Sequence, residues 1–435
     1  AYDLPLAIGI LAATEQIKCE GIGDYVMMGE LSLDGGLRPI SGVLPIAIQA
    51  RKEGFRGMFI PVQNAREAAI VNDIEVYGIS HISELIAFFQ EGKVLDRTIV
   101  NTREEFYNRL DKYPVDFADV KGQENIKRAF EIAAAGGHNV ILVGPPGAGK
   151  TMLAKRLPTI LPPLNLAEAL ETTKIHSVAG KLRKNEALIS TRPFRAPHHT
   201  ISDVALVGGG SFPQPGEISL AHHGVLFLDE LPEFKRTVLE VMRQPLEDRV
   251  VTISRSRFSV EYPASFMLIA SMNPCPCGFY NHPEKECVCG PGVVQKYLNK
   301  VSGPLLDRID IHIEVTPVTY EQLAESRRGE GSAAIRARVI ESRTLQEDRF
   351  QQHASIYCNA QMDSKLIKEH CGIDESGHVL MKNAMSRLKL SARAYDRILK
   401  VARTIADLEK SGPIRTHHLA EAIQYRSLDR ENWAG

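Results

Sequence analysis

The chain has 435 residues, a formal net charge of −1, 44% hydrophobic residues and 24% charged residues. These values are typical of a soluble globular protein of about two to four domains, and they exclude a disordered or strongly basic chain. Any binding site for a polyanion must therefore be local. No apolar run approaches the roughly 18 residues of a membrane span, and no signal peptide is visible. Seven cysteines, an odd number in a long chain, favour a reducing cytoplasm over a disulfide framework. The start at Ala1, without Met, leads us to expect an N-terminal truncation.

Residues 1–92 alternate helix-like and strand-like segments and are expected to form a first domain. A hairpin is predicted to turn at residues 34–36, and Asn64 is predicted to cap a helix. The expected helices span 3–17, 43–54 and 64–71, a strand is expected at 57–62, and the segment 82–92 closes the unit. Residues 93–115 are charged and mixed, which predicts a linker.

From residue 116 the pattern becomes strand–helix–strand, with buried strands expected at 138–144, 224–230 and 264–273. Such alternation predicts an α/β fold with a parallel sheet over 116–316. After Pro317 the strand signal fades. Amphipathic spacing then predicts connecting helices in 317–347 and a C-terminal helical domain over 348–435. The expected helices are 320–329, 333–350, 365–372, 377–390, 393–412 and 415–426.

The segment "GPPGAGKT" (144–151) satisfies the phosphate-binding pattern G-x-x-x-x-G-K-[ST] between a predicted strand and a predicted helix. Its glycines allow backbone N–H groups to surround phosphates, and the helix N-terminus adds positive potential. Lys150 is expected to reach the β and γ phosphates of ATP, and the Thr151 hydroxyl is expected to bind Mg²⁺. The predicted nucleotide-binding residues here are Gly144, Pro145, Pro146, Gly147, Ala148, Gly149, Lys150, Thr151 and Met152.

Two carboxylates, Asp229 and Glu230, end the apolar strand "VLFLDE". Ligands of α/β sheets bind at the carboxyl ends of strands, so Asp229 is expected in the Mg²⁺ shell and Glu230 is expected to orient the attacking water. A solvated strand end is the other reading. Asn273 follows the third strand and either positions the same water or is a turn residue. The predicted reaction is ATP hydrolysis.

Together, "DFADVKGQE", "GPPGAGKT", "RPFRAPHHT", "GEISLAHHGVLFLDELPEF", "LEDRVVTISR", "MNPCPCG" and "LLDRIDI" resemble the magnesium chelatase-like AAA+ ATPases of the ComM/YifB group over residues 116–430. The resemblance implies a ring, expected to be a hexamer, with ATP between subunits. It also implies that Asn273 is sensor 1, that Arg308 is an arginine finger given to a neighbouring subunit, and that Arg393 or Arg397 is sensor 2. Val120 and Gly122 are then expected near adenine. Without the resemblance, these arginines read as surface charge.

The first domain resembles the Lon-type protease domain, which has an S5-like fold. Laid against that family, Leu6 stands at the place of the nucleophilic Ser, and Leu44 stands at the place of its partner Lys. A Ser–Lys dyad needs a hydroxyl and an amine, which leucines do not provide. We therefore expect no peptidase activity and an assembly or structural role.

The family resemblance implies a DNA motor that drives branch migration during natural transformation and homologous recombination. The segment "RVVTISRSRFSVEY" predicts a hairpin whose tip carries Arg255 and Arg257, and six such tips in a pore could bind DNA. A second segment runs from "RPFRAPHHT" through "VALVGGGSFPQPGEI". It contains Arg192, Arg195, His198 and His199 and then three consecutive glycines, and it predicts a flexible insert. The alternatives are a motor subunit of a magnesium chelatase, which is not expected to carry a Lon-like domain, and a nucleotide-dependent scaffold.

Four of the seven cysteines form two pairs, Cys275/Cys277 and Cys287/Cys289, separated by nine residues. Four thiolates suit tetrahedral Zn²⁺, although the C-x-C spacing is tighter than usual. Unliganded thiols and redox chemistry remain the alternatives. His282 is a possible substitute ligand. The position of this loop, directly after Asn273, predicts a supporting role beside the γ-phosphate.

Overall fold

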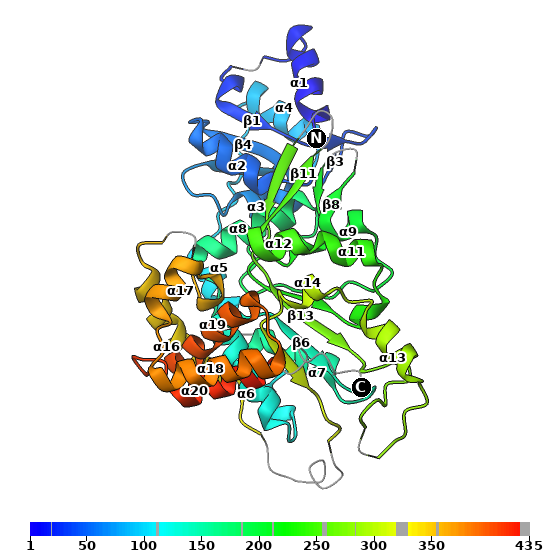
Figure 1. The fold of residues 1–435 in the computed structure, drawn as a ribbon. Coiled ribbons are helices and arrows are strands. Elements are labelled where there is room, and N and C mark those ends of the chain that lie inside the picture. Colours follow the sequence, from blue (N-terminus) through cyan, green and yellow to red (C-terminus); the bar gives the residue numbers. More distant parts are fainter. Residues whose placement is uncertain are drawn as a thin grey trace. The chain divides into compact units, whose positions relative to one another are not determined.

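A computed structural model describes residues 1–18, 20–109, 113–183, 186–210, 213–254, 259–282, 284–318, 329–353 and 356–426. The chain divides into two compact units (Figure 1). Unit 1 contains residues 1–112 and 163–191, and unit 2 contains residues 113–162 and 192–435. The segment 163–191 lies inside the range expected for the ATPase core, yet it packs with the N-terminal residues. The domain limits expected from the sequence otherwise stay predictions.

Unit 1 is built on a parallel sheet with the strand order β1-β4-β5, beside a short β2–β3 hairpin. The distant segment contributes Leu164, which precedes α8, and Ala169 of α8 to the same apolar cluster as Ala47 of α2. The elements are α1 (Asp3–Ala13), η1 (Ile22–Asp24), β1 (Tyr25–Met27), β2 (Glu30–Leu31), β3 (Leu37–Arg38), α2 (Val43–Lys52), β4 (Gly57–Pro61), α3 (Val62–Ala68), β5 (Glu75–Ile79), α4 (Ile82–Gln90), α5 (Thr102–Arg109) and α8 (Leu166–Val178).

Two local expectations for unit 1 differ from the structure. Asn64 does not cap α3, because this helix begins at Val62 and has Pro61 at its N-cap. The Asn64 side chain instead donates to the Ile40 carbonyl oxygen at 2.9 Å and accepts from the Ile40 N–H at 3.0 Å. A tertiary contact has therefore replaced the local one. The segment expected to be a linker also contains a helix, α5.

Unit 2 contains a five-stranded parallel sheet with the order β14-β6-β13-β10-β7. Successive residues of β6 alternate between two apolar clusters: Val140 and Leu142 belong to one, and Ile141 and Val143 belong to the other. Both faces of the sheet are thus buried, as the expected parallel fold requires. The strands are β6 (Val140–Val143), β7 (Phe194–Arg195), β8 (Gly208–Gly209), β9 (Gln214–Pro215), β10 (Val225–Leu228), β11 (Val250–Ser254), β12 (Ser259–Pro263), β13 (Met267–Met272) and β14 (Ile311–Glu314).

The helices of the α/β part of unit 2 cover this sheet and follow its strands (Figure 1). They are η2 (Phe117–Asp119), α6 (Glu124–Gly136), α7 (Lys150–Arg156), η3 (Leu157–Ile160), α9 (Asp203–Val207), α10 (Glu217–Leu220), η4 (Leu231–Glu233), α11 (Arg236–Val241), α12 (Arg243–Asp248), α13 (Pro291–Leu298) and α14 (Gly303–Leu306).

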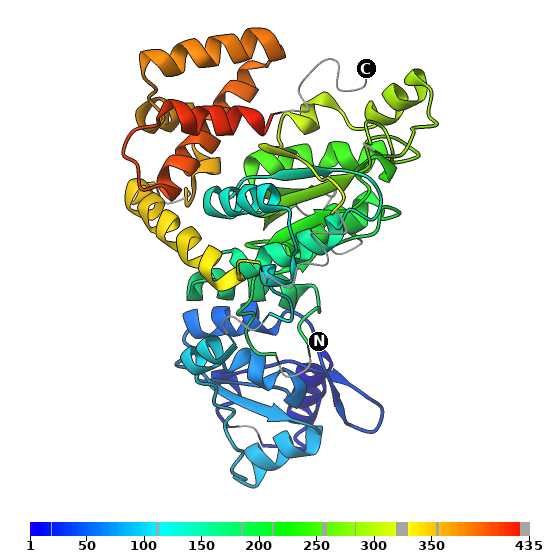
Figure 2. The ribbon, with the colours of Figure 1, turned by 90° about the horizontal axis from the view of Figure 1, so that it is seen from below.

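The C-terminal helices of unit 2 form a group of their own, drawn from yellow through orange to red in Figure 2. Ile398 and Leu399 of α19 share an apolar cluster with Phe130 of α6, so the group is anchored on one side of the α/β part. The group contains α16 (Ser332–Phe350), η5 (Asn359–Gln361), α17 (Ser364–His370), α18 (Glu375–Leu388), α19 (Ala392–Leu408) and α20 (Thr416–Gln424). The helix expected at 320–329 falls almost entirely outside the described residues.

The predicted hairpin is present: β11 pairs antiparallel with β12, from Val250 opposite Pro263 to Ser254 opposite Ser259. Its tip, with Arg255 and Arg257, lies outside the described residues. Among the helices that the structure describes, none has the length and apolar character needed to cross a bilayer.

Candidate nucleotide-binding site

A cavity of about 380 Å³ lies where the strands β6, β13 and β10 end. Its wall is made of the predicted phosphate-binding loop, the two predicted carboxylates and Asn273. The strand order explains this meeting, because β13 lies between β6 and β10 and all three are parallel. Their carboxyl ends therefore share one edge of the sheet, where ligands of such folds bind.

The phosphate-binding loop has the backbone that its glycines allow. Gly147 and Gly149 have φ angles of 81° and 85°, in the left-handed region. At Gly144 a Cβ atom would lie 2.3 Å from the carbonyl oxygen of Val315, so no side chain fits there. Helix α7 begins at Lys150, directly after the loop, and directs its N-terminus at the cavity.

Lys150 is held beside the loop by three oxygen atoms. Its Nζ atom donates to the carbonyl oxygens of Gly144 at 2.7 Å and Pro145 at 2.9 Å, and to Oδ1 of Asn273 at 3.1 Å. Burial lowers the pKa of this amine, and the charges of Asp229 and Glu230 only partly oppose that effect. A phosphate would supply the negative charge that favours the ammonium form.

Thr151 and Asp229 lie together, as a shared metal ligand set would need. The Thr151 hydroxyl donates to Oδ2 of Asp229 at 2.7 Å, and the Ser271 hydroxyl donates to Oδ1 of the same carboxylate. Hydroxyl and carboxylate oxygens are ligands that Mg²⁺ prefers. These residues therefore fit Mg²⁺, with Thr151 and Asp229 as ligands and Ser271 orienting the carboxylate.

Glu230 begins a sharp turn after β10. Its φ angle is 55°, and its N–H donates to Oδ1 of Asp229 at 3.2 Å. The side chain is 56% exposed, and Oε2 lies 3.5 Å from Nδ1 of His199. A solvated carboxylate at the cavity mouth can accept a proton from water, whereas Asp229 is already occupied by two hydroxyl donors.

The segment around Val120 and Gly122 reaches the loop through its neighbour Gln123. The Gln123 amide donates to the carbonyl oxygens of Ala148 and Thr316, each at 3.2 Å. Val120 is 1% exposed, and Gly122 has a φ angle of 61°. Neither Val120 nor Gly122 is among the residues that line the cavity.

The predicted arginines lie elsewhere. Asn139 precedes β6 and Asp310 precedes β14, so both mark the amino edge of the sheet, opposite the phosphate-binding loop. Arg397 Nη1 lies 2.8 Å from Oδ1 of Asp310, and the Asn139 N–H donates to Oδ2 at 2.9 Å. Burial favours a neutral Asp310, but Arg397 and then His138 outweigh it and hold the pKa of the carboxyl far below its ordinary value. The structure thus does not bring Arg397 to the loop of its own chain.

Arg308 also belongs to the amino edge. Its carbonyl oxygen accepts from the Asn139 amide at 3.2 Å. Its guanidinium is 5% exposed, with Nη2 2.6 Å from Oε1 of Glu247 and Nη1 donating to the Pro304 carbonyl oxygen at 2.6 Å. Arg393 is exposed on the first turn of α19. None of the three arginines lines the cavity of its own chain.

Three site residues were not expected from the sequence: Ser271, Gln123 and His199. A polar residue in an otherwise apolar strand was the available signal for Ser271. The basic segment that contains His199 was expected to be a flexible insert, but it is partly ordered by ion pairs. Arg195 binds Glu217 through two hydrogen bonds of 2.6 and 2.7 Å. Arg192 donates to the Pro162 and His223 carbonyl oxygens, so both arginines have structural partners.

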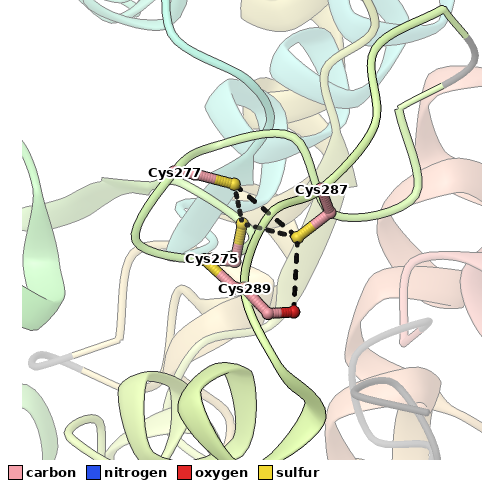
Figure 3. A group of neighbouring side chains, drawn as sticks. All are labelled: Cys275, Cys277, Cys287 and Cys289. Carbon is pink, nitrogen blue, oxygen red and sulfur yellow. Dashed lines mark hydrogen bonds between the residues drawn. The ribbon is translucent and has the colours of Figure 1, made fainter.

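The four paired cysteines converge beside this site (Figure 3). Cys275 Sγ lies 3.3 Å from Cys277 Sγ and 3.7 Å from Cys287 Sγ, and the last two atoms are 3.6 Å apart. Burial opposes ionisation of Cys277, but the Phe279 N–H and the Cys275 thiol outweigh it and lower the pKa of Cys277 to about 6. His282 is not part of the group, because its Nδ1 accepts from two backbone N–H groups, those of residues 284 and 285.

In unit 1, the two positions aligned with the peptidase dyad differ in burial. Leu6 is 62% exposed on α1, and Leu44 is 0% exposed on α2. Beside Leu44, the buried carboxylate of Glu67 accepts from the Leu44 N–H at 3.0 Å and from the Ser177 hydroxyl. Neither leucine offers a nucleophile or a base. The absence of peptidase activity in this domain stays a prediction.

Comparison with known proteins matches three family models to the chain. The model described as "Magnesium chelatase, subunit ChlI" matches residues 116–323, and its C-terminal counterpart matches residues 329–426. A third, described as "Subunit ChlI of Mg-chelatase", matches residues 1–64. The presence of residues 1–64 therefore does not speak against a chelatase subunit, because a family model of that description matches them.

Similar individual proteins cover almost the whole chain. The chain is 43% identical over 430 residues to competence protein ComM of Haemophilus influenzae, covering 99% of this chain and 83% of that protein. It is 42% identical over 434 residues to protein YifB of Salmonella typhimurium, covering 99% and 82%. It is also 31% identical over 192 residues to Lon protease 2 of Bacillus subtilis, covering 38% and 33%.

Proposed function

Because this chain belongs to the magnesium chelatase-like AAA+ ATPases of the ComM/YifB group, we propose that it is a ring-shaped, ATP-hydrolysing motor that moves DNA strands by branch migration. The family supports the ATPase part. The observation that supports hydrolysis best is the shared sheet edge, where Lys150, Asp229 and Glu230 line one cavity. ATP and Mg²⁺ are the cofactors of this proposal.

In the proposed reaction, Lys150 exchanges its carbonyl partners for the β and γ phosphates. Thr151 and Asp229 would hold Mg²⁺, which would supply positive charge beside the phosphates. Glu230 takes the proton of the attacking water as the water oxygen bonds to the γ-phosphorus. The bond from that phosphorus to the β–γ bridging oxygen breaks, and ADP leaves with that oxygen. Asn273, which accepts a hydrogen bond from Lys150, orients the water. Val120 and Gly122 lie on the side of the loop where we place adenine.

In the proposed ring, an arginine of one subunit lies at the nucleotide of its neighbour. Phosphoryl transfer is accelerated when an arginine stabilises the transition-state charge. Among the predicted arginines, Arg308 is the one that we assign to the neighbouring subunit's nucleotide, and a hexamer is the assembly that we propose. The assignment requires that Arg308 exchanges its ion pair with Glu247 for a phosphate oxygen. Arg393 is the candidate sensor 2, because it is exposed, whereas Arg397 is engaged by Asp310.

Subunit mixing tests the ring and the role of Arg308. Chains with Lys150→Ala and chains with Arg308→Ala should each hydrolyse little ATP alone. Mixed together, they form interfaces that contain one intact Lys150 and one intact Arg308, so turnover should partly return. No recovery in a mixture that co-assembles would refute the role in a neighbouring subunit. Glu247→Gln is the matched control and should keep turnover, because it removes only the partner of the resting state.

ATP turnover with and without forked DNA tests the motor proposal. We expect DNA to stimulate turnover, strand displacement to require ATP, and Glu230→Gln to abolish both while nucleotide still binds. Turnover that no DNA stimulates would overturn the DNA motor and favour a chelatase subunit. Unchanged turnover in Glu230→Gln would overturn the assignment of the base.

DNA contact is proposed for the hairpin tip. The net charge of −1 gives no global attraction for DNA, so a local pair of arginines is needed. Replacing Arg255 and Arg257 by Ala should remove DNA stimulation and keep basal turnover. Lys365→Ala with Lys368→Ala removes the same charge from the exposed side of α17 and should change neither. Free thiols in the described chain suit the cytoplasmic location that we propose.

A further inference from the structure

The four paired cysteines have the spacing of a metal centre and not of disulfides. Bonds of about 2.3 Å from tetrahedral Zn²⁺ place neighbouring sulfur atoms about 3.8 Å apart. The three measured separations are 3.3, 3.6 and 3.7 Å, and all four Sγ atoms lie within 4.8 Å of one another. A disulfide needs about 2.05 Å. In Figure 3 the sulfur atoms of Cys275, Cys277 and Cys287 face one another, and Cys289 lies beside them at the end of the same loop.

The loop that carries these cysteines has few other means of keeping its shape. Its described residues, from the end of β13 at Met272 to the start of α13 at Pro291, form no helix or strand. Long loops of this kind in compact domains usually have a function or an added constraint. Cys275 is 0% exposed, and the other three cysteines are half-buried.

The same loop rests on the phosphate-binding loop. Gly278, one residue after Cys277, has a φ angle of 85°, and its N–H donates to the Cys275 carbonyl oxygen at 3.0 Å. A Cβ atom on Gly278 would lie 2.4 Å from Cδ of Pro146, so the turn and the phosphate-binding loop are in direct contact. At the other end, Asn273 precedes the cysteines by two residues and binds Lys150.

We propose that Cys275, Cys277, Cys287 and Cys289 bind one structural Zn²⁺ as thiolates, and that the ion supports the phosphate-binding loop through the contact of Gly278 with Pro146. The metal binds no nucleotide and enters no chemical step. It fixes the turn against which Pro146 packs and the residue, Asn273, that follows β13. The metal site stands by itself, whereas the support of the loop rests on the proposed nucleotide binding.

Metal analysis of the purified full chain tests the site. We expect one zinc per chain, retained during dialysis against a chelator and lost when Cys275 and Cys277, or Cys287 and Cys289, are changed to Ser. Cys371→Ser is the matched control, because it removes a buried thiol that lies outside the cluster, and it should keep the zinc. A folded chain without zinc, or zinc retained after all four changes, would overturn the proposal.

A second measurement covers the case in which the Ser variants do not fold. Wild-type chain in which Co²⁺ replaces the metal should show the intense sulfur-to-cobalt bands and the visible spectrum of a tetrahedral tetrathiolate site. A weak spectrum typical of six oxygen ligands would overturn the assignment of the four cysteines.

Two glycines next to cysteines separate support of the loop from metal binding. Gly278→Ala should keep the zinc and weaken binding of a fluorescent adenine nucleotide, on the order of tenfold, as expected for a displaced supporting contact. Gly290→Ala is the control, because a Cβ atom there meets nothing within 4 Å and φ is −64°. Equal affinities in both variants would overturn the support of the loop. Absence of nucleotide binding in wild type would instead refute the proposed function and leave the zinc result standing.

Discussion

Asp310 is predicted to stabilise unit 2, and its replacement by Asn gives a test that also decides the role of Arg397. The carboxylate is 1% exposed and contacts three groups: the Arg397 guanidinium of α19, and the Asn139 N–H and His138 ring before β6. Asn at this position keeps the shape and can still accept from the backbone. It removes the negative charge that faces the Arg397 guanidinium.

The expected cost follows from the burial of the pair. Removing one partner of a buried ion pair typically costs about 3–5 kcal/mol, because the other charge remains without compensation. The Arg397 side chain is 19% exposed, so water relieves part of this cost, and we expect about 3 kcal/mol for Asp310→Asn. Arg393→Met, at an exposed position of the same helix, should stay within about 0.5 kcal/mol of wild type.

Urea unfolding followed by far-ultraviolet circular dichroism measures these free energies in Asp310→Asn, Arg397→Met and the double variant. A coupling energy of about 1–3 kcal/mol between the two changes is expected for groups in contact. A cost below about 1 kcal/mol with no coupling would refute a stabilising pair. If Arg397 is sensor 2, then Arg397→Met lowers ATP turnover in folded protein while Asp310→Asn does not. Equal turnover in the two variants supports the stabilising role.

Three further changes test the site and its surroundings. Ser271→Ala should weaken Mg²⁺-dependent ATP binding and cost about 1 kcal/mol in stability, because Asp229 loses one hydroxyl donor. Titration with Mg²⁺ at fixed nucleotide measures the effect on binding. An unchanged Mg²⁺ requirement would contradict it. Gly144→Ala should abolish nucleotide binding in a fluorescence assay, because its Cβ atom would lie 2.3 Å from the Val315 carbonyl oxygen, and full binding would show that the loop can move away. Burial lowers the pKa of His138, so below about pH 6.5 the unfolded chain takes up a proton that the folded chain does not. The free energy of unfolding should therefore fall as the pH falls through that range. Urea unfolding at about pH 7 and pH 5.5 measures this loss, and His138→Asn should reduce it.

The convergence of the candidate site residues could be predicted from the sequence because its parts are local. Gly144 to Thr151 form one contiguous motif, and Asp229 and Asn273 each end an apolar strand. The rule that ligands bind at the carboxyl ends of parallel strands then brings them together. Contacts across the fold could not be predicted in this way. The hydrogen bond from Ser271 to Asp229 and the ion pair between Arg397 and Asp310 depend on which elements are neighbours in the fold. A single sequence does not state that order.

The same limit explains why the expectations for Asn64 and for the segment that contains Arg195 differ from the structure. Asn64 has the residue type of a helix cap, but its amide binds Ile40, which is 24 residues away. In the sequence, Arg195 resembles an exposed basic residue without a partner, but an ion pair with Glu217 neutralises its charge. In both cases a side chain that is suited to a local or solvent role has a distant partner, and only the three-dimensional structure shows the partner.

The return of residues 163–191 to unit 1 limits how the molecule can be cut into separate pieces. The polypeptide passes between the two units three times, after residues 112, 162 and 191, so no single cut yields two intact pieces. A fragment that begins at residue 113 would carry α8 without the α2 surface that covers it, and would expose Leu164 and Ala169. Engineers who want the motor part alone should therefore replace residues 163–191 with a short linker as well as remove the first 112.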